Sequence, residues 1–244
     1  MVGPVRHGPE TLLPSPTSPR GSLAGSLLLL TLAWLSACGP VEVRTVPGET
    51  TDAASSATAV ALITGPSDVG HELLGTPAPS LDGVRWLDGE AHPLSEDLGK
   101  PVLIRWWTDT CPFCVNSAPA LRGLAERFGD DLVIRAIYHE KPIGRTVSDF
   151  EVNTSADRLG LPFLLGRDDR WTALTRWWLG AGGRDYTSVS FLVDPEGRIV
   201  AIHTGAEFHG DEVAAEDCVR SPDLCRAERE ALEKAIGELL HPGT

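Results

Sequence analysis

The feature that most constrains this chain is a Cys-x-x-Cys motif, Cys111 to Cys114, between an apolar segment and an amphipathic one. Residues 102–107 are mostly apolar, which predicts a buried central strand. After the motif, apolar residues recur at three- and four-residue spacing up to Phe128, which predicts a helix that Gly129 ends. Residues 132–138 predict a second buried strand. The motif is therefore expected at the start of a helix within a β-α-β unit.

This position suits thiol chemistry. Unpaired backbone N–H groups and the helix dipole at a helix N-terminus stabilise a thiolate on the first cysteine. The second cysteine lies one turn further on and can close a disulfide with it. Cys111 is therefore the expected nucleophile and Cys114 the expected resolving cysteine. A structural disulfide, or half of a metal site, is the alternative interpretation of the motif.

The rest of the chain predicts an α/β domain with an N-terminal β-hairpin extension. In that hairpin, residues 84–87 run into a turn at Asp88-Gly89 and residues 91–92 return as the partner strand. A second hairpin is expected around the turn at residues 194–197. The other expected elements are helices at 146–159, 169–179 and 224–240, and strands at 163–165, 189–193 and 198–203.

The N-terminus predicts export. The apolar run from Leu23 to Leu35 is too short to cross a hydrocarbon core of about 30 Å and has the length of a signal-peptide core. It ends in residues 35–38 (LSAC), which resemble a bacterial lipobox. We therefore expect residues 1–37 to be a signal peptide and Cys38 to carry the lipid that anchors the protein to a membrane; an ordinary signal peptide is the alternative. Gly39, by the usual sorting rule, favours the outer membrane and a periplasmic location.

Residues 38–70 are expected to be a flexible linker, because the small and polar residues of 41–64 bury too little surface to offset their ordering entropy. The folded domain is expected at 71–244. The formal net charge of −13 argues against nucleic-acid binding, because an acidic body repels phosphate backbones.

The chain has five cysteines, and lipidation of Cys38 would leave two close pairs. An oxidising compartment favours disulfides. We predict a structural disulfide between Cys218 and Cys225 that ties the incoming chain to the last helix, which Ser221-Pro222 would start. A second redox pair, or a zinc site made of both cysteine pairs, is the alternative.

Residues 107–114 (WTDTCPFC), with Pro119 in the following helix, resemble the active-site segment of TlpA/ResA-type thioredoxin-like proteins. Residues 75–79 resemble their entry segment and residues 191–200 their last hairpin. The resemblance implies a thioredoxin-like fold, with a central mixed sheet and helices on both faces. It also implies disulfide reduction or exchange outside the cytoplasm, on protein or small-molecule substrates, often for cytochrome c maturation or envelope stress defence. We expect no cofactor and a monomer.

Three positions depart from the family pattern. Ser188 stands where a cis-proline usually faces the two cysteines, Ser117 replaces a glutamate of some members, and Thr110 replaces a tryptophan before the first cysteine. The residues expected to border the site or bind substrate are Trp107, Thr108, Pro112, Phe113 and Ser188.

A peroxidase is the second candidate function. Thr108 precedes Cys111 by three residues, as in the Thr-x-x-Cys motif of peroxiredoxins. The match is partial, because Ile104 stands at the position of that family's proline and Arg184 is only a candidate for its arginine. Sulfenate formation at Cys111 followed by disulfide closure would allow both activities.

A metal-handling protein is the third candidate. His139, His203 or His209 together with the CxxC would resemble copper-handling thioredoxin relatives, although those have wider cysteine spacing. Isolated histidines are usually ordinary surface or capping groups, so no metal ligand is assigned. The direction of electron flow is left open by the sequence.

Overall fold

The fold is built on the strand that precedes the CxxC motif. A computed structural model of the protein describes residues 62–67, 69–161 and 163–243. The expected signal peptide, the expected lipidation site Cys38 and the expected linker up to residue 61 lie outside the described residues. No helix in the described part of the chain is long and apolar enough to cross a membrane.

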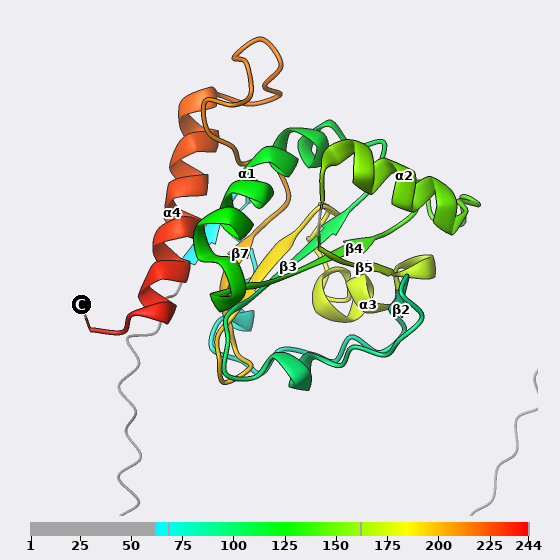
Figure 1. The fold of residues 1–244 in the computed structure, drawn as a ribbon, viewed down its shortest axis with the longest axis horizontal. Helices are drawn as coiled ribbons and strands as arrows, with labels where there is room; N and C mark the ends of the chain where they lie inside the picture. Colours follow the sequence, from blue (N-terminus) through cyan, green and yellow to red (C-terminus); the bar gives the residue numbers. More distant parts are fainter. Residues whose placement is uncertain (1–61, 68, 162, 244) are drawn as a thin grey trace, which may run out of the picture. The chain divides into compact units, whose positions relative to one another are not determined.

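The sheet is mixed and seven-stranded, in the order β1-β7-β6-β3-β4-β5-β2 (Figure 1). Its three central parallel strands are β3, β4 and β5, and β6 runs antiparallel to β3 on the other side. The strands are β1 (Leu62–Thr64), β2 (Arg85–Trp86), β3 (Val102–Trp107), β4 (Val133–Tyr138), β5 (Leu164–Arg167), β6 (Ser190–Val193) and β7 (Ile199–His203).

Helices cover both faces of this sheet, as the family resemblance implies. Side chains of α1 (Pro112–Phe128), α2 (Asp149–Leu159) and α4 (Pro222–Leu240) contribute to one buried apolar cluster. The cluster on the other face takes its helical residues from α3 (Thr172–Leu174) and the π-helical turn η5 (Thr175–Leu179). The short 3-10 turns are η1 (His71–Leu73), η2 (Leu94–Asp97), η3 (Gly129–Asp131) and η4 (Asp169–Trp171).

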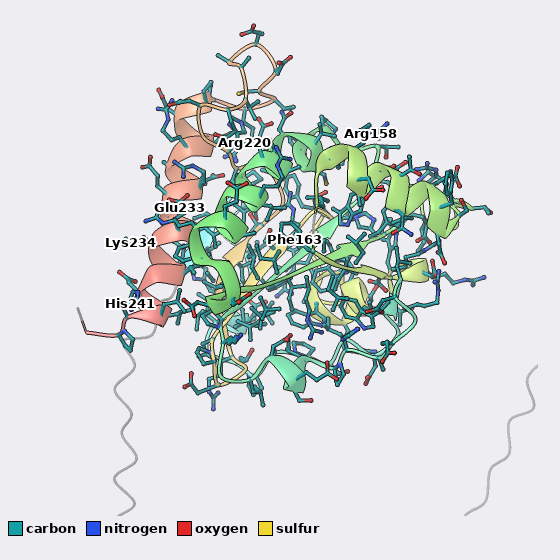
Figure 2. The ribbon with its side chains drawn as sticks, in the orientation of Figure 1. Arg158, Phe163, Arg220, Glu233, Lys234 and His241 are labelled. Carbon is teal, nitrogen blue, oxygen red and sulfur yellow. The ribbon has the colours of Figure 1, made fainter. Side chains whose placement is uncertain are left out.

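Strand β3 supplies both cores because successive side chains of a strand point to opposite faces. Leu103 and Trp107 belong to the cluster under α1, whereas Ile104 and Trp106 belong to the other. The side chains fill the space between the sheet and the helices, and the partly buried Phe163 packs against the first cluster (Figure 2). Arg105 therefore lies on the α1 face, the face that carries the CxxC motif.

Two expectations at the N-terminal side are corrected. The linker was expected to reach residue 70, but Leu62–Thr64 pairs in parallel with β7 and so belongs to the sheet. A short apolar and β-branched segment can do this because the edge of β7 offers unpaired backbone groups. The expected N-terminal hairpin is also wrong: β2 pairs antiparallel with β5, and residues 91–92 form no strand.

The expected helix at residues 169–179 is broken into three short turns. Arg170 and Trp171 have φ of 60° and 58°, in the left-handed region. The carboxylate of Asp168 accepts hydrogen bonds from the N–H groups of Ala173 (2.8 Å) and Leu174 (2.6 Å). Regular helix therefore begins at Thr172, because Asp168 satisfies the first free N–H groups there.

Candidate active site

Cys111 and Cys114 lie at the N-terminus of α1, where the sequence predicts them. Cys111 is the N-cap residue and Pro112 occupies the first helical turn, where its missing N–H costs nothing. The side chain of Cys111 is partly exposed, whereas Cys114 is only 4% exposed. Both are free thiols, and the two residues approach within 3.4 Å. A disulfide, with sulfur atoms about 2 Å apart, needs only a small further movement.

Ser188 faces both cysteines from the segment before β6. Its hydroxyl oxygen lies 3.3 Å from the sulfur of Cys111 and 3.1 Å from that of Cys114. The residue is buried, with 5% of its surface exposed. The hydroxyl is therefore placed to donate a hydrogen bond to a thiolate on either cysteine.

The two thiols have different acidities. The hydrogen bond from Cys114 makes the largest contribution to lowering the pKa of Cys111, which falls to about 5; hydrogen bonds from Ser188 and from the N–H of Cys114 lower it further, against the effect of burial. Burial, followed by the hydrogen bond to Cys111, raises the pKa of Cys114 well above its usual range. At neutral pH Cys111 is therefore the thiolate and Cys114 the thiol that donates to it.

Arg105 places a positive charge inside the core next to this pair. It is 1% exposed, and its guanidinium donates to Ser190 Oγ at 3.0 Å and to the carbonyl of Ala206 at 3.1 Å. Within the described part of the chain no carboxylate forms an ion pair with it. Its charge lowers the pKa of both cysteine thiols. A cysteine thiolate is thus the counter-charge that this buried cation interacts with.

A second polar cluster fixes the loop in front of Cys111. The carboxylate of Asp109 accepts two hydrogen bonds from the guanidinium of Arg145, at 2.9 and 2.8 Å, and one from the hydroxyl of Tyr138 at 3.0 Å. The hydrogen bonds from Arg145 contribute most to lowering the pKa of Asp109. This arrangement connects the loop to β4 and to the segment before α2.

The other residues predicted for the site surround the pair. Trp107 is buried and packs edge-on against Tyr138, with ring centroids 5.2 Å apart. Pro112 is exposed and Phe113 half-buried beside Cys111. The buried hydroxyl of Thr108 donates to Asp109 at 3.2 Å. The hydroxyl of Thr108 is therefore hydrogen-bonded to Asp109 and not to Cys111, although the Thr-x-x-Cys spacing resembles that of peroxiredoxins.

Sequence reasoning missed Arg105, Asp109 and Arg145. A signal for Arg105 was present, because an arginine in the middle of an apolar strand has to be buried with its charge. The ion pair of Asp109 with Arg145 joins residues 36 positions apart, and no local pattern identifies it.

None of the three histidines joins the CxxC pair. His139 is fully buried, which lowers its pKa to about 4, and His203 Nε2 donates to Glu228 at 3.0 Å. His209 lies near Glu207 and Cys225 instead. The two cysteine pairs do not gather into one cluster among the described residues, so the expected alternative of a four-thiolate zinc site is not formed.

The expected Cys218–Cys225 disulfide is absent from the structure, where both residues are free thiols. Each sulfur has another polar neighbour: Cys218 Sγ lies 3.4 Å from His209 Nε2, and Cys225 Sγ lies 3.7 Å from Glu207 Oε1. The helix start at Ser221-Pro222 is confirmed, since Ser221 is the N-cap of α4.

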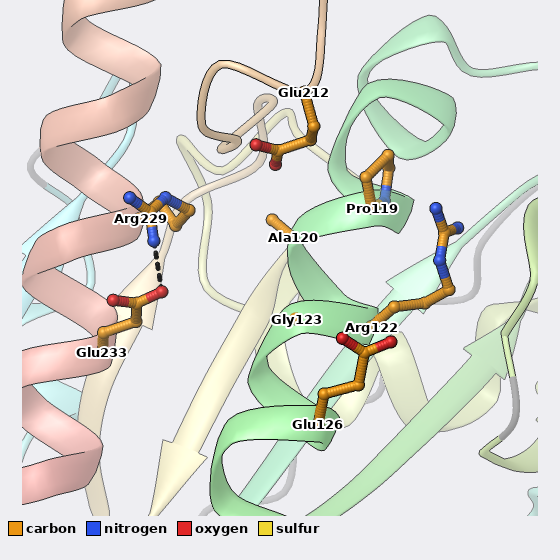
Figure 3. Close-up of a pocket in the computed structure, with 8 residues that line it drawn as sticks. All are labelled: Pro119, Ala120, Arg122, Gly123, Glu126, Glu212, Arg229 and Glu233. Atoms are coloured by element: carbon orange, nitrogen blue, oxygen red, sulfur yellow. Dashed lines mark hydrogen bonds and ion pairs between the residues drawn. The ribbon is translucent and has the colours of Figure 1, made fainter.

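A shallow groove of about 300 Å³ lies between α1 and α4 (Figure 3). Arg229 and Glu233 form an ion pair on its α4 side. Neither cysteine of the motif lines this groove, so it is separate from the candidate active site. Its lining residues are Pro119, Ala120, Arg122, Gly123, Glu126, Glu212, Arg229 and Glu233.

The mixed sheet and the strand–CxxC–helix arrangement define a thioredoxin-like fold. The chain is similar to the thioredoxin-like protein YneN of Bacillus subtilis, with 27% identity over 135 residues, which is 54% of this chain and 71% of that protein. No protein-family model matches the chain.

Two solved structures share the fold. A candidate protein disulfide isomerase from Bacteroides thetaiotaomicron matches with a TM-score of 0.51 and 22% identity, over 70% of this chain and 91% of the other. A candidate thiol:disulfide interchange protein DsbE from Chlorobium tepidum matches with a TM-score of 0.51 and 20% identity, over 68% and 97% of the two chains. The chain therefore has the thioredoxin-like fold.

Proposed function

We propose that this protein is a thiol–disulfide oxidoreductase that acts through Cys111 and Cys114. The observation that carries the proposal is the contrast between the two thiols: Cys111 is partly exposed with a pKa of about 5, and Cys114 is buried beside it. An exposed thiolate next to a resolving thiol is what disulfide exchange requires. The names of the two similar solved structures, a disulfide isomerase and a thiol:disulfide interchange protein, support the same class of reaction.

The exchange proceeds in two balanced steps. The thiolate of Cys111 attacks one sulfur of a substrate disulfide, the substrate S–S bond breaks, and the other substrate sulfur leaves as a thiolate that takes up a proton. Cys114 then loses its proton and attacks the sulfur of Cys111, which releases the second substrate thiol. The substrate gains two electrons and two protons, and the protein gains the Cys111–Cys114 disulfide. The reverse sequence oxidises a substrate dithiol. The electrons come from the cysteines, so no cofactor is needed.

The surroundings of the cysteine pair support an expectation for its reduction potential. Ser188 and Arg105 stabilise a thiolate, which exists only in the reduced form, and neither has such a partner in the disulfide form. Stabilising the reduced form raises the reduction potential. We therefore expect a couple that is more oxidising than thioredoxin, with a potential above about −270 mV. Equilibration with glutathione redox buffers measures it, and a potential below that of thioredoxin would show that the stabilisation does not act.

We further propose that the protein works outside the cytoplasm as a monomer. Lipid on Cys38 would anchor it in the cell envelope, with the outer membrane favoured and the domain facing the periplasm. The support is the apolar run and the lipobox-like residues 35–38. Replacing Cys38 by serine should move the protein from the membrane to the soluble fraction. Continued membrane association of this variant would contradict the anchor.

Turnover tests the main activity. The purified protein should catalyse reduction or reshuffling of a disulfide-bonded protein substrate in a glutathione buffer, and Cys111→Ser should abolish this. Cys38→Ser is the matched control, because it removes a cysteine that belongs to neither the redox pair nor the last helix, and it should retain turnover. Equal activity of the Cys111→Ser variant and the wild type would contradict the proposal.

A further inference from the structure

A buried group of metal-ligating side chains lies away from the CxxC pair, where the segment after β7 meets the start of α4. Glu207 and His209 come from that segment and Cys225 from the first turns of α4. All three are at most 1% exposed. One potential ligand atom from each lies within 4.8 Å of the others. The partly exposed Cys218, in the loop before α4, adds a fourth candidate ligand beside His209.

The separations of these atoms suit one metal ion. His209 Nε2 lies 4.0 Å from Glu207 Oε2 and 3.4 Å from Cys218 Sγ. Cys225 Sγ lies 3.7 Å from Glu207 Oε1. In a tetrahedral zinc site, ligand distances of about 2.0–2.3 Å place neighbouring ligand atoms about 3.3–3.8 Å apart. The ligand atoms of Glu207, His209 and Cys225 lie within 4.8 Å of one another, so they would have to approach by up to about 1 Å to hold one ion. Cys218 contacts His209 but lies outside that group of three, so its loop would have to move towards Glu207 and Cys225 as the ion binds.

His209 is oriented as metal-binding histidines are. Its Nδ1 lies 2.9 Å from the carbonyl oxygen of Gly210, which accepts a hydrogen bond from the Nδ1–H. The proton is thereby assigned to Nδ1, and the lone pair of Nε2 is directed at the other ligand atoms. Such a hydrogen bond from the second ring nitrogen to a carbonyl fixes the tautomer that coordinates a metal.

Glu207 is held in the same way. Its Oε2 accepts a hydrogen bond from Asn116 Nδ2 at 2.5 Å, and its Oε1 accepts one from the N–H of Arg220 at 2.5 Å. Each carboxylate oxygen can accept more than one bond, so both retain a lone pair for a cation.

We propose that Glu207, His209, Cys218 and Cys225 form a binding site for Zn²⁺. The two thiolates, one carboxylate and one neutral imidazole are all zinc ligands, and a closed set of four protein ligands is typical of structural sites. Binding releases the two thiol protons to solvent, and the ion remains Zn²⁺ throughout. The ion would fasten the segment after β7 and the loop at Cys218 to α4. The partly exposed Cys218 provides the side from which the ion enters.

The test uses the full chain with the triple change Cys38→Ser, Cys111→Ser and Cys114→Ser. Cys218 and Cys225 are then the only cysteines, so the CxxC pair cannot contribute and the outcome is independent of disulfide exchange. Under reducing conditions, Zn²⁺ titrated in competition with a chromogenic chelator should bind at one ion per chain. Co²⁺ in its place should give the absorption bands of thiolate coordination. Bound Zn²⁺ should also raise the melting temperature.

Variants made in this background identify the ligands. His209→Ala, Cys225→Ser and Cys218→Ser should each weaken Zn²⁺ binding at least tenfold. Cys218→Ser alters a partly exposed loop residue, so it tests the site without removing a core side chain. His71→Ala is the matched control, because His71 is an exposed histidine on η1, and it should bind as the background does.

Two outcomes would overturn the proposal. One is a stoichiometry below one ion per chain, or binding that the Cys218 and His209 variants leave unchanged. The other is peptide mapping of the wild-type protein that finds a Cys218–Cys225 disulfide after purification from its natural compartment, because a disulfide removes both thiolates.

Discussion

The hydroxyl of Ser188 lies 3.1 Å from the sulfur of Cys114, although 74 residues separate them in the sequence. The same hydroxyl lies 3.3 Å from the sulfur of Cys111. Ser188, at the position where the family resemblance implies a proline, thus contacts both sulfur atoms of the redox pair.

Replacing Ser188 by alanine should raise the pKa of Cys111. A hydrogen bond to a charged group contributes about 1.5 kcal/mol or more, and one pKa unit corresponds to about 1.4 kcal/mol, so a rise of about one unit is expected. The pH dependence of iodoacetamide labelling measures it. Thr187→Val is the matched control, because the buried hydroxyl of Thr187 has no hydrogen-bond partner in the structure. Identical labelling profiles for Ser188→Ala and the wild type would refute this role.

Arg105 should set the reduction potential. Arg105→Met removes the buried positive charge, which destabilises the thiolate of Cys111 and therefore the reduced form. We expect a potential that is lower by about 30 mV for each 1.4 kcal/mol lost, measured against glutathione. Arg105→Lys keeps the charge and should recover part of the shift. A merely structural arginine would lower the melting temperature of both redox forms equally and leave the potential unchanged.

Thr108 should have no part in peroxide chemistry. Its hydroxyl donates to Asp109, so the isosteric Thr108→Val change should leave the rate of Cys111 oxidation by hydrogen peroxide within about twofold, or about 0.4 kcal/mol. Stopped-flow fluorescence of the reduced protein can follow this reaction. A loss of fast peroxide turnover in Thr108→Val would make the peroxidase the better description of the protein.

Acid should weaken the attachment of α4 through Glu228. Burial alone would raise the pKa of this carboxyl, but hydrogen bonds from His203 and Arg220 lower it to about 2. A lowered carboxyl pKa contributes stability above the unfolded-state value of about 4.5, and this contribution is lost as the pH falls towards 2. Glu228→Gln should cost about 3 kcal/mol at neutral pH. The difference in the free energy of unfolding between Glu228→Gln and the wild type, measured by urea unfolding, should shrink as the pH falls from 4.5 to 2. A difference that does not depend on pH would contradict the ion-pair account. The exposed Glu230→Gln is the control.

The sequence predicts the strand–CxxC–helix unit well because both periodicities there are strong and local. The apolar run of β3 and the spacing of Cys114, Ala118, Leu121 and Leu124 on α1 each describe a single face. β1 was not predicted because a strand of three residues, next to a segment of small and polar side chains, is too short to show an alternation of apolar and polar residues. Only the pairing of Leu62–Thr64 with β7 reveals it.

The chemistry around the pair was less predictable, because it depends on contacts between distant segments. Ser188 was identified through a family resemblance, and its distances to the sulfur atoms come from the fold. The partners of Cys218 and Cys225 could not be inferred from their spacing. Glu207 and His209 reach them only because the chain after β7 passes the start of α4.

Trapping a mixed disulfide tests the central claim most directly. In a Cys114→Ser variant the second step of exchange is blocked, so a disulfide-bonded protein substrate should remain covalently attached. Mass spectrometry of non-reduced peptides should locate the bond at Cys111, and the complex should be absent from the Cys111→Ser variant. Attachment through Cys218 or Cys225, or no reducible complex in Cys114→Ser, would contradict the assignment of Cys111 as the nucleophile of a disulfide exchange.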